Sequence, residues 1–177
     1  MELSLYKSAD RSAIRALFAQ TFSDSEGQSE GRLIGGLAED LMNEAGDDVM
    51  GLIATESEKI IACIFFTRLS FDVPVEAFLL APVAVHSDHQ GKKIGQKLIN
   101  FGLEQLGAKA VQFVLTYGDP RFYSKFGFEH VPDHLAKAPY PLTQPEGWLF
   151  QALNGGDIHQ LSGACRCVES FNDSRYW

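Results

Sequence analysis

The chain has 177 residues, 45% hydrophobic and 21% charged, and this composition fits a single domain over residues 1–177 with a sizeable core. A formal net charge of −8 argues against nucleic acid as a partner, because sequence-independent affinity for phosphate backbones needs an extended basic surface. No apolar run reaches the roughly 18 to 20 residues of a membrane span, and the N-terminal segment is too short for a signal peptide, so we expect no membrane partner and a cytoplasmic location.

The first part of the chain predicts a strand over residues 2–7 and then two amphipathic helices, the first capped by Ser8 or Asp10. Apolar residues recur at helical spacing: Ile14, Leu17 and Phe18 in the first helix, and Leu33, Ile34, Leu37 and Leu41 in the second. Acidic residues dominate residues 24–48. This run indicates either a solvated helix face or a surface that attracts a cationic acceptor.

The middle of the chain predicts a mixed sheet. Strands are expected over residues 49–54, 60–69 and 77–85, and the short turns between them favour antiparallel hairpins. A helix over residues 91–106 and a strand over residues 111–116 follow, and this order implies a parallel pair joined by a right-handed crossover. We therefore expect an α/β fold whose mixed sheet is mostly antiparallel.

Pro82 stands inside the most apolar predicted strand, where it cannot donate to a ladder. Such a proline marks an edge, an ordinary bulge or a place where two strands part. If the strands part, backbone groups of Val83 and Val85 lose a strand partner and become available to an extended, amide-bearing ligand.

The turn after this strand has the features of a phosphate site. Gly91 and Gly95 let the backbone approach a ligand, and N–H groups at a helix start attract anions. Lys92, Lys93 and Lys97 add positive charge between residues 89 and 103, where there is no acid before Glu104. A plain solvated helix start is the alternative interpretation.

Residues 118–128 predict a short helix with both ends marked. Asp119 can accept hydrogen bonds from first-turn N–H groups, Pro120 suits the first helical position, and Gly127 suits a left-handed C-terminal turn. The helix fixes Tyr123, whose ring either packs in the core or serves a site.

The last part of the chain predicts a proline-rich loop over residues 131–147 and a core strand over residues 148–153. Residues after Gly156 fit a partner-dependent tail, an extra strand or a homodimer contact. Cys63, Cys165 and Cys167 give neither a disulfide framework nor a four-ligand zinc site, so we expect no metal, and Cys-Arg-Cys suggests an alternating strand.

The Gln-Gly-x-x-x-Gly turn with its basic helix, together with the later Tyr-x-x-Phe-Gly-Phe, resembles the GNAT superfamily of acyl-CoA-dependent N-acetyltransferases. Gly-Asp-Pro-x-x-Tyr is similar to a group of small prokaryotic members. The resemblance covers roughly residues 3–153. It implies a mixed sheet with helices on both faces and acetyl-CoA as co-substrate in a V-shaped opening between splayed fourth and fifth strands.

Carried onto this sequence, the resemblance places Val83 and Val85 beside the pantetheine amides and Tyr123 near the thioester sulfur. The pyrophosphate would be held by Gln90, Gly91, Lys92, Lys93, Ile94, Gly95 and Gln96. Two positions depart from the family pattern. Lys93 stands where the family has its first glycine of the turn, and Leu79 stands where some members carry a glutamate on the fourth strand.

The implied reaction is direct attack of a primary amine, on a small molecule or a peptide, on the thioester. Such an amine must lose its proton first, and Glu76, His86 and Asp72 are open candidates for the base. Tyr123 would stabilise the leaving thiolate with a hydrogen bond. Lys93 and the missing strand carboxylate also permit the alternative of a CoA-binding regulatory module without catalysis.

Overall fold

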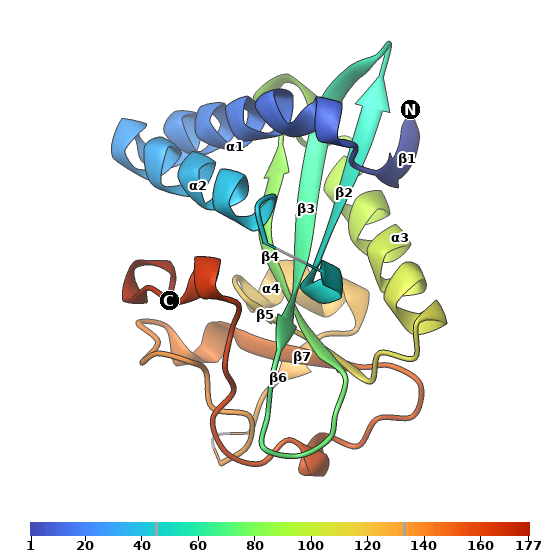
Figure 1. Ribbon diagram of the computed structural model, residues 1–177, viewed down its shortest axis with the longest axis vertical. Helices are drawn as coiled ribbons and strands as arrows, with labels where there is room; N and C mark the ends of the chain where they lie inside the picture. Colours follow the sequence, from blue (N-terminus) through green and yellow to red (C-terminus); the bar gives the residue numbers. More distant parts are fainter. Residues whose placement is uncertain (45, 133) are drawn as a thin grey trace. The chain divides into compact units, whose positions relative to one another are not determined.

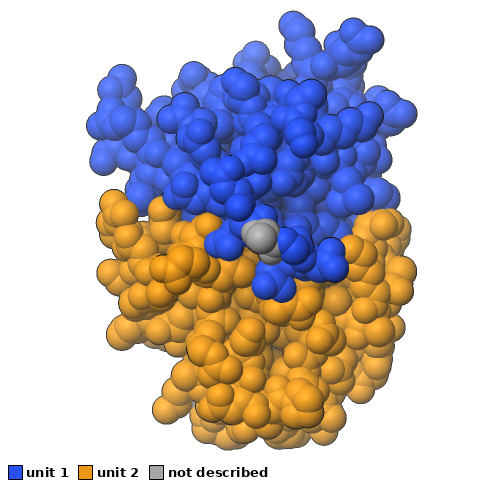
Figure 2. Space-filling view, in the orientation of Figure 1, with its two compact units in different colours: residues 1–66, 82–102 blue, residues 67–81, 103–177 orange. Residues whose placement is uncertain are grey.

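The computed structural model describes residues 1–44, 46–132 and 134–177 (Figure 1). The strands in these residues are β1 (Glu2–Leu5), β2 (Val49–Glu56), β3 (Lys59–Leu69), β4 (Ala77–Val85), β5 (Phe113–Tyr117), β6 (Glu129–His130) and β7 (Trp148–Ala152). The α-helices are α1 (Arg11–Glu26), α2 (Gln28–Leu41), α3 (Ile94–Ala108) and α4 (Pro120–Tyr123). Figure 2 colours the two compact units into which the chain divides, residues 1–66 with 82–102 and residues 67–81 with 103–177.

The sheet is mixed and mostly antiparallel, as the sequence predicts. Its strand order is β1-β2-β3-β4-β5-β7-β6. The pair β4–β5 is parallel, whereas β1–β2, β5–β7 and β6–β7 are antiparallel. The predicted strands and helices are present with shifted ends, and β6 was not predicted because two residues carry no readable alternation.

Helices cover both faces of β3 in the first unit. Neighbouring residues of a strand point to opposite faces of the sheet, so the contacts of Phe65 and Phe66 show what packs on each face. The Phe65 ring lies 5.8 Å from the ring of Phe18 in α1. A Cβ added to Gly102 of α3 would lie 2.3 Å from the Phe66 ring, so α3 packs directly on the other face. The predicted helix layers are confirmed.

Helices α1 and α2 pack against each other as a hairpin (Figure 1). Gly27 joins them with a φ of 99°, a conformation that favours glycine. A Cβ on Gly31 or Gly35 would lie within 3 Å of Ala19 or Ser23, so both glycines permit close helix contact. No helix among the described residues has the length and apolarity needed to cross a bilayer.

The C-terminal segment of the second unit is extended, but it is not the strand that Cys165-Arg166-Cys167 suggested. Its β-bridges are isolated and join it to two separate parts of the unit. Arg166 pairs with Ser70, whereas Ser162 and Ala164 pair with Leu135 and Lys137 of the proline-rich loop. No continuous ladder forms because these partners do not belong to one strand. At the end of the chain Trp177 is buried, and its ring lies 5.9 Å from that of Trp148. The homodimer contact stays a prediction.

Cys165 provides a test of this packing. The residue is 3% exposed, and burial, with a smaller effect of Cys167, raises the pKa of its thiol to about 12. An unfolded chain has a cysteine pKa near about 8.5. Because the folded-state pKa is the higher one, the stabilising contribution is complete below about pH 8.5 and is lost as the pH rises toward 12.

We expect Cys165 to account for about 1 to 2 kcal/mol of the stability lost by pH 10. Urea unfolding under reducing conditions at pH 7.5 and pH 10 measures this, and Cys165→Ala should show the smaller alkaline loss. Cys167→Ala, at a half-buried thiol, is the control and should change the loss less. Equal alkaline losses in wild type and Cys165→Ala would contradict the assignment.

Candidate functional site

The ladder between β4 and β5 is short. It pairs Ala77 with Phe113, Phe78 with Val114 and Leu79 with Leu115, although β4 itself continues to Val85. The next residue of β5, Thr116, is fully buried, and its hydroxyl donates a hydrogen bond of 2.9 Å to the Leu80 carbonyl. A side chain thus satisfies the carbonyl where the backbone ladder stops. The strands cease to pair just before Pro82, which is one of the alternatives that this proline left open and the one that the family resemblance implied.

Beyond this point β4 alternates in burial. Pro82 and Ala84 are buried, whereas Val83 and Val85 are half-buried. The Val85 carbonyl accepts a hydrogen bond of 3.1 Å from Gln90 Nε2. Val85 and Gln90, two residues of the predicted site, are therefore directly linked.

Gly95 lies against the same end of β4. A Cβ added to Gly95 would approach Val85 Cγ2 to 3.3 Å, which is tighter than most Cβ contacts. A larger side chain would press on the strand end. The first turn of α3 can pack closely on β4 because residue 95 is glycine.

The turn before α3 presents a run of backbone donors. Lys93 accepts the first helical hydrogen bond, from the Lys97 N–H at 3.1 Å, so α3 begins at Ile94 and not at the predicted Gly91. The N–H groups from Gly91 to Gln96 have no acceptor among the described residues. Such donors lie at the positive end of the helix dipole and suit an anion.

Two residues of this turn have left-handed backbone conformations. Gly91 has a φ of 73° and Lys93 a φ of 60°. This conformation is free for glycine but costs a side-chain-bearing residue about 1 kcal/mol. Lys93 therefore adopts a backbone conformation that is strained for lysine but unstrained for glycine.

Side chains around the turn hold it in place. Lys92 Nζ donates to the Asp88 carbonyl at 3.0 Å, while Lys93 and Lys97 are exposed. Ser87 Oγ donates to Asp24 Oδ2 at 2.6 Å, which ties the turn to the end of α1. The acidic run was interpreted as a solvated face or an acceptor surface, but Asp24 contacts the turn itself.

Tyr123 is the last residue of α4, which starts as predicted but is shorter than predicted. A 3₁₀ turn over Ser124–Phe126 continues the segment to Gly127. The Asp119 carboxylate accepts from the Arg121 N–H at 2.9 Å, and Gly127 takes a φ of 83°. A Cβ on Gly118 would lie 2.5 Å from Tyr123 Cε2, so the ring lies directly on the Gly118 backbone.

The Tyr123 phenol is neutral at physiological pH. Burial raises its pKa above the ordinary value near 10, and the Thr116 hydroxyl opposes this rise in part. A neutral phenol with a raised pKa is a good hydrogen-bond donor but a weak acid. Sequence patterns gave no signal for Thr116 beyond its place at the end of a predicted strand.

The three candidate bases differ in their surroundings. Glu76 pairs with Arg68 at 2.6 Å and precedes the paired end of β4, away from where β4 and β5 part. Asp72 pairs with Arg166 at 2.8 Å in the loop before β4. His86 follows β4, and its Nδ1 accepts from the Asp88 N–H at 3.3 Å, so the neutral ring carries its proton on Nε2. None is assigned as the base.

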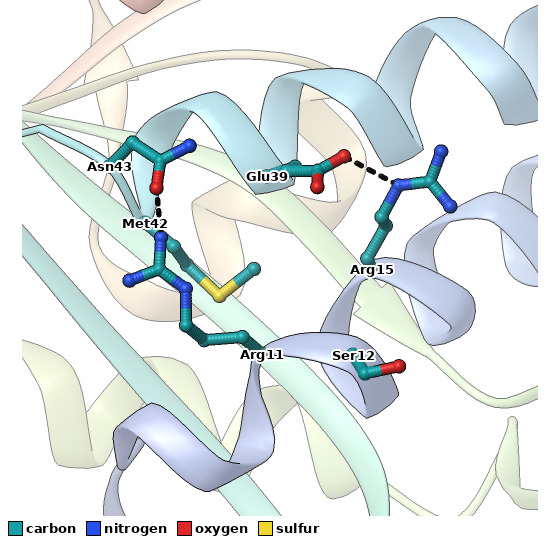
Figure 3. A pocket seen from close by; sticks show the side chains of 6 residues that line it. All are labelled: Arg11, Ser12, Arg15, Glu39, Met42 and Asn43. Carbon is teal, nitrogen blue, oxygen red and sulfur yellow. Dashed lines mark hydrogen bonds and ion pairs between the residues drawn. The ribbon is translucent and has the colours of Figure 1, made fainter.

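A cavity of about 560 Å³ lies between the start of α1 and the end of α2 (Figure 3). Arg15 Nε donates to Glu39 Oε2 at 2.7 Å, and Arg11 donates to Asn43. The first pair joins α1 to α2, and the second joins α1 to the turn after α2. The cavity contains none of the predicted site residues. The described residues contain no group of three or more His, Cys, Asp or Glu side chains placed for a metal ion.

Comparisons with known proteins identify the family of the chain. Residues 47–130 match the family described as the acetyltransferase (GNAT) domain. The chain is 31% identical to the uncharacterized N-acetyltransferase YjhQ of Escherichia coli K12, over 91% of this chain and 88% of the relative. It is 30% identical to the uncharacterized N-acetyltransferase YhbS of the same organism, over 92% and 93% of the two chains.

Solved structures show the same fold. The crystal structure of Escherichia coli YhbS in complex with CoA aligns with a TM-score of 0.82 and 26% identity, covering 98% of this chain and 92% of that one. A GNAT acetyltransferase from Brucella melitensis, crystallised with acetyl-CoA, aligns with a TM-score of 0.72 and 22% identity, covering 96% and 97%. On this evidence the chain belongs to the GNAT family of acetyltransferases.

Proposed function

We propose that this chain moves an acetyl group from acetyl-CoA to a primary amine of a small molecule or peptide, by direct attack in a ternary complex. Residues 1–177 would act as one N-acetyltransferase domain, because the relatives align with nearly the whole chain. The family membership supports acetyl transfer, and the CoA complex of YhbS supports the carrier. The free thiols of Cys63, Cys165 and Cys167 suit a reducing cytoplasm.

The observation that carries the proposal is that the N–H groups from Gly91 to Gln96 have no acceptor in the part of the chain that the structure describes. A diphosphate offers several anionic oxygens, and consecutive backbone donors with nearby lysines match them. Gln90 would keep this turn attached to β4 through its bond to Val85. Val83 and Val85, past the last β4–β5 pair, would offer backbone groups to the pantetheine amides.

The chemistry needs an uncharged amine and a stabilised leaving group. The amine nitrogen bonds to the thioester carbon, the carbon–sulfur bond breaks, and the sulfur leaves with the bonding electrons. Removing the proton from a lysine-like amine at pH 7 costs roughly 4 to 5 kcal/mol, because the pKa of such an amine lies near 10.4. Its proton passes to water or to a base that is not assigned.

Tyr123 would donate a hydrogen bond to the departing sulfur. Its raised pKa makes full proton transfer to a thiolate, whose acid has a pKa near about 8.5, uphill. The role that fits is a hydrogen bond that strengthens as charge develops on sulfur. Proton transfer would then be concerted with later steps or follow them.

Calorimetry with CoA and a free-thiol assay with acetyl-CoA and an amine panel test the proposal together. We expect CoA binding and thiol release that depends on the added amine. Binding without amine-dependent release on a broad panel would favour the regulatory module. No CoA binding would contradict the proposal as a whole.

The backbone conformation of Gly91 gives a specific prediction. A Cβ on Gly91 has room, but alanine is strained at a φ of 73°, so Gly91→Ala should weaken CoA binding about fivefold. Gly107→Ala is the matched control, since its added Cβ also has room and its φ is not positive. Calorimetry should find unchanged affinity in the control. Equal affinities in both variants would rule out a role for the Gly91 backbone.

Lys93 combines backbone strain with a charge, and Lys93→Gly separates the two. Relief of strain should raise the free energy of unfolding by about 1 kcal/mol. Loss of the ammonium should weaken CoA binding a few-fold at low salt, and the difference should shrink as salt screens the charge. Denaturant unfolding and calorimetry at two ionic strengths measure both effects. Tighter CoA binding in the glycine variant would mean that the lysine side chain crowds the site.

Tyr123→Phe removes only the phenol oxygen. We expect kcat to fall by about 100-fold, with acetyl-CoA affinity changed less than about twofold, because the hydrogen bond acts mainly on the leaving sulfur. Steady-state thiol release and calorimetry report the two quantities. Unaltered turnover would exclude Tyr123 from the reaction.

A further inference from the structure

Tyr117, the last residue of β5, holds part of the proline-rich loop. Its phenol oxygen lies 2.9 Å from Thr143 Oγ1 and accepts a hydrogen bond of 2.9 Å from the Gln144 N–H. Because that N–H uses a phenol lone pair, the phenol proton remains for the Thr143 oxygen. Tyr117 is half-buried, and its hydroxyl contacts the loop and not the hydrophobic core.

The backbone of the next residue makes a second contact with the same loop. The Gly118 N–H donates to the Gly147 carbonyl at 2.9 Å. A Cβ on Gly147 would lie 2.8 Å from the Gly118 oxygen and 3.3 Å from the Tyr117 ring, so residue 147 must be very small. Residues 143–147, which we call the clamped segment, therefore lie directly on the end of β5.

Gly118 also supports Tyr123. The Tyr123 ring occupies the space where a Cβ of Gly118 would be, with Cε2 at 2.5 Å from that position. The dipeptide Tyr117–Gly118 thus carries both the proposed partner of the thioester sulfur and the clamped segment. If Tyr123 contacts the thioester sulfur, as proposed, the clamped segment lies on the same short stretch of backbone as the reacting group.

Other anchors of the loop lie outside the clamped segment. Trp148 Nε1 donates to the Ala136 carbonyl at 2.7 Å, and the Tyr140 hydroxyl donates to Asn172 Oδ1 at 2.9 Å. Lys137 exchanges backbone hydrogen bonds with the C-terminal segment, accepting from Cys165 and donating to Gly163, each at 2.9 Å. Asp133, also part of the predicted loop, lies outside the described residues.

Two different sets of contacts therefore hold the two parts of the loop. The C-terminal segment fixes residues 135–140, whereas the side chain that holds residues 143 and 144 is that of Tyr117. Pro141 precedes the clamped segment and Pro145 lies within it, and both limit its backbone freedom. Loss of one hydroxyl should therefore shift a short stretch without unfolding the loop.

We propose that Tyr117 is a positioning residue that sets the clamped segment as a wall for the amine acceptor, and thereby controls which amines are acetylated. The inference rests on the proposed function, because it needs the reaction to occur beside Tyr123. The residues assigned to acetyl-CoA, from Val83 to Gln96, do not belong to this cluster. The effect should accordingly appear in acceptor kinetics and not in carrier affinity.

The test compares Tyr117→Phe with wild type, using spermidine, kanamycin and a lysine-containing peptide as acceptors in the thiol-release assay. Loss of the two hydrogen bonds should raise the acceptor KM about fivefold or change the order of preference, while the acetyl-CoA Kd changes less than about twofold. Thr143→Val should behave similarly, and the double variant should be no worse than the stronger single variant.

Tyr140→Phe is the matched control, because it also removes one tyrosine hydroxyl bond from this loop but leaves the β5 contact intact. Its acceptor KM should stay at the wild-type value. An active wild type whose acceptor KM and preference are unchanged in Tyr117→Phe overturns the inference alone, as does an equal effect in Tyr140→Phe. A wild type without CoA binding overturns the proposed function and this inference together.

Discussion

The early end of the β4–β5 ladder is the constraint on which the proposed site depends. Parallel strands pair through their backbones, and after Leu79 and Leu115 this pairing is replaced by one side-chain bond from Thr116 to the Leu80 carbonyl. The replacement satisfies a buried acceptor, so the strands can part without leaving that carbonyl unpaired. Pro82 then removes one donor from β4 and discourages any renewed pairing. We propose that the backbone of β4 beyond this point, which does not pair with β5, is available to CoA.

The turn after β4 also leaves backbone groups without a protein partner among the described residues. Left-handed conformations at Gly91 and Lys93 aim successive N–H groups away from any protein acceptor that the structure describes. Lys93 shows that the conformation itself is what the turn needs, since a lysine adopts it despite the strain. The net charge of −8 works against an anion at long range, so these local donors and lysines must provide the attraction.

Local signals predicted much of this arrangement. Asp119 and Pro120 marked the start of α4, and Gly127 marked the end of the 3₁₀ turn that follows it, because each acts on its own stretch of backbone. Pro82 indicated that strand pairing changes near it, although an edge or a bulge was also open. The start of α3 was placed three residues too early, since nothing in the sequence shows that Lys93 is left-handed. Contacts between residues far apart in the sequence were also missed. Asp24 meets Ser87 across 63 positions, and Tyr117 meets Thr143 across 26, and neither pair has a spacing that sequence patterns can reveal.

A crystal structure with CoA bound would show whether the turn before α3 holds the diphosphate. We expect diphosphate oxygens within hydrogen-bond distance of the N–H groups of Gly91–Gln96, and pantetheine amides paired with the backbone of Val83 and Val85. We also expect a β4–β5 ladder that still ends at Leu79 and Leu115. CoA bound away from this turn, or a ladder that continues past Pro82, would contradict the proposed site.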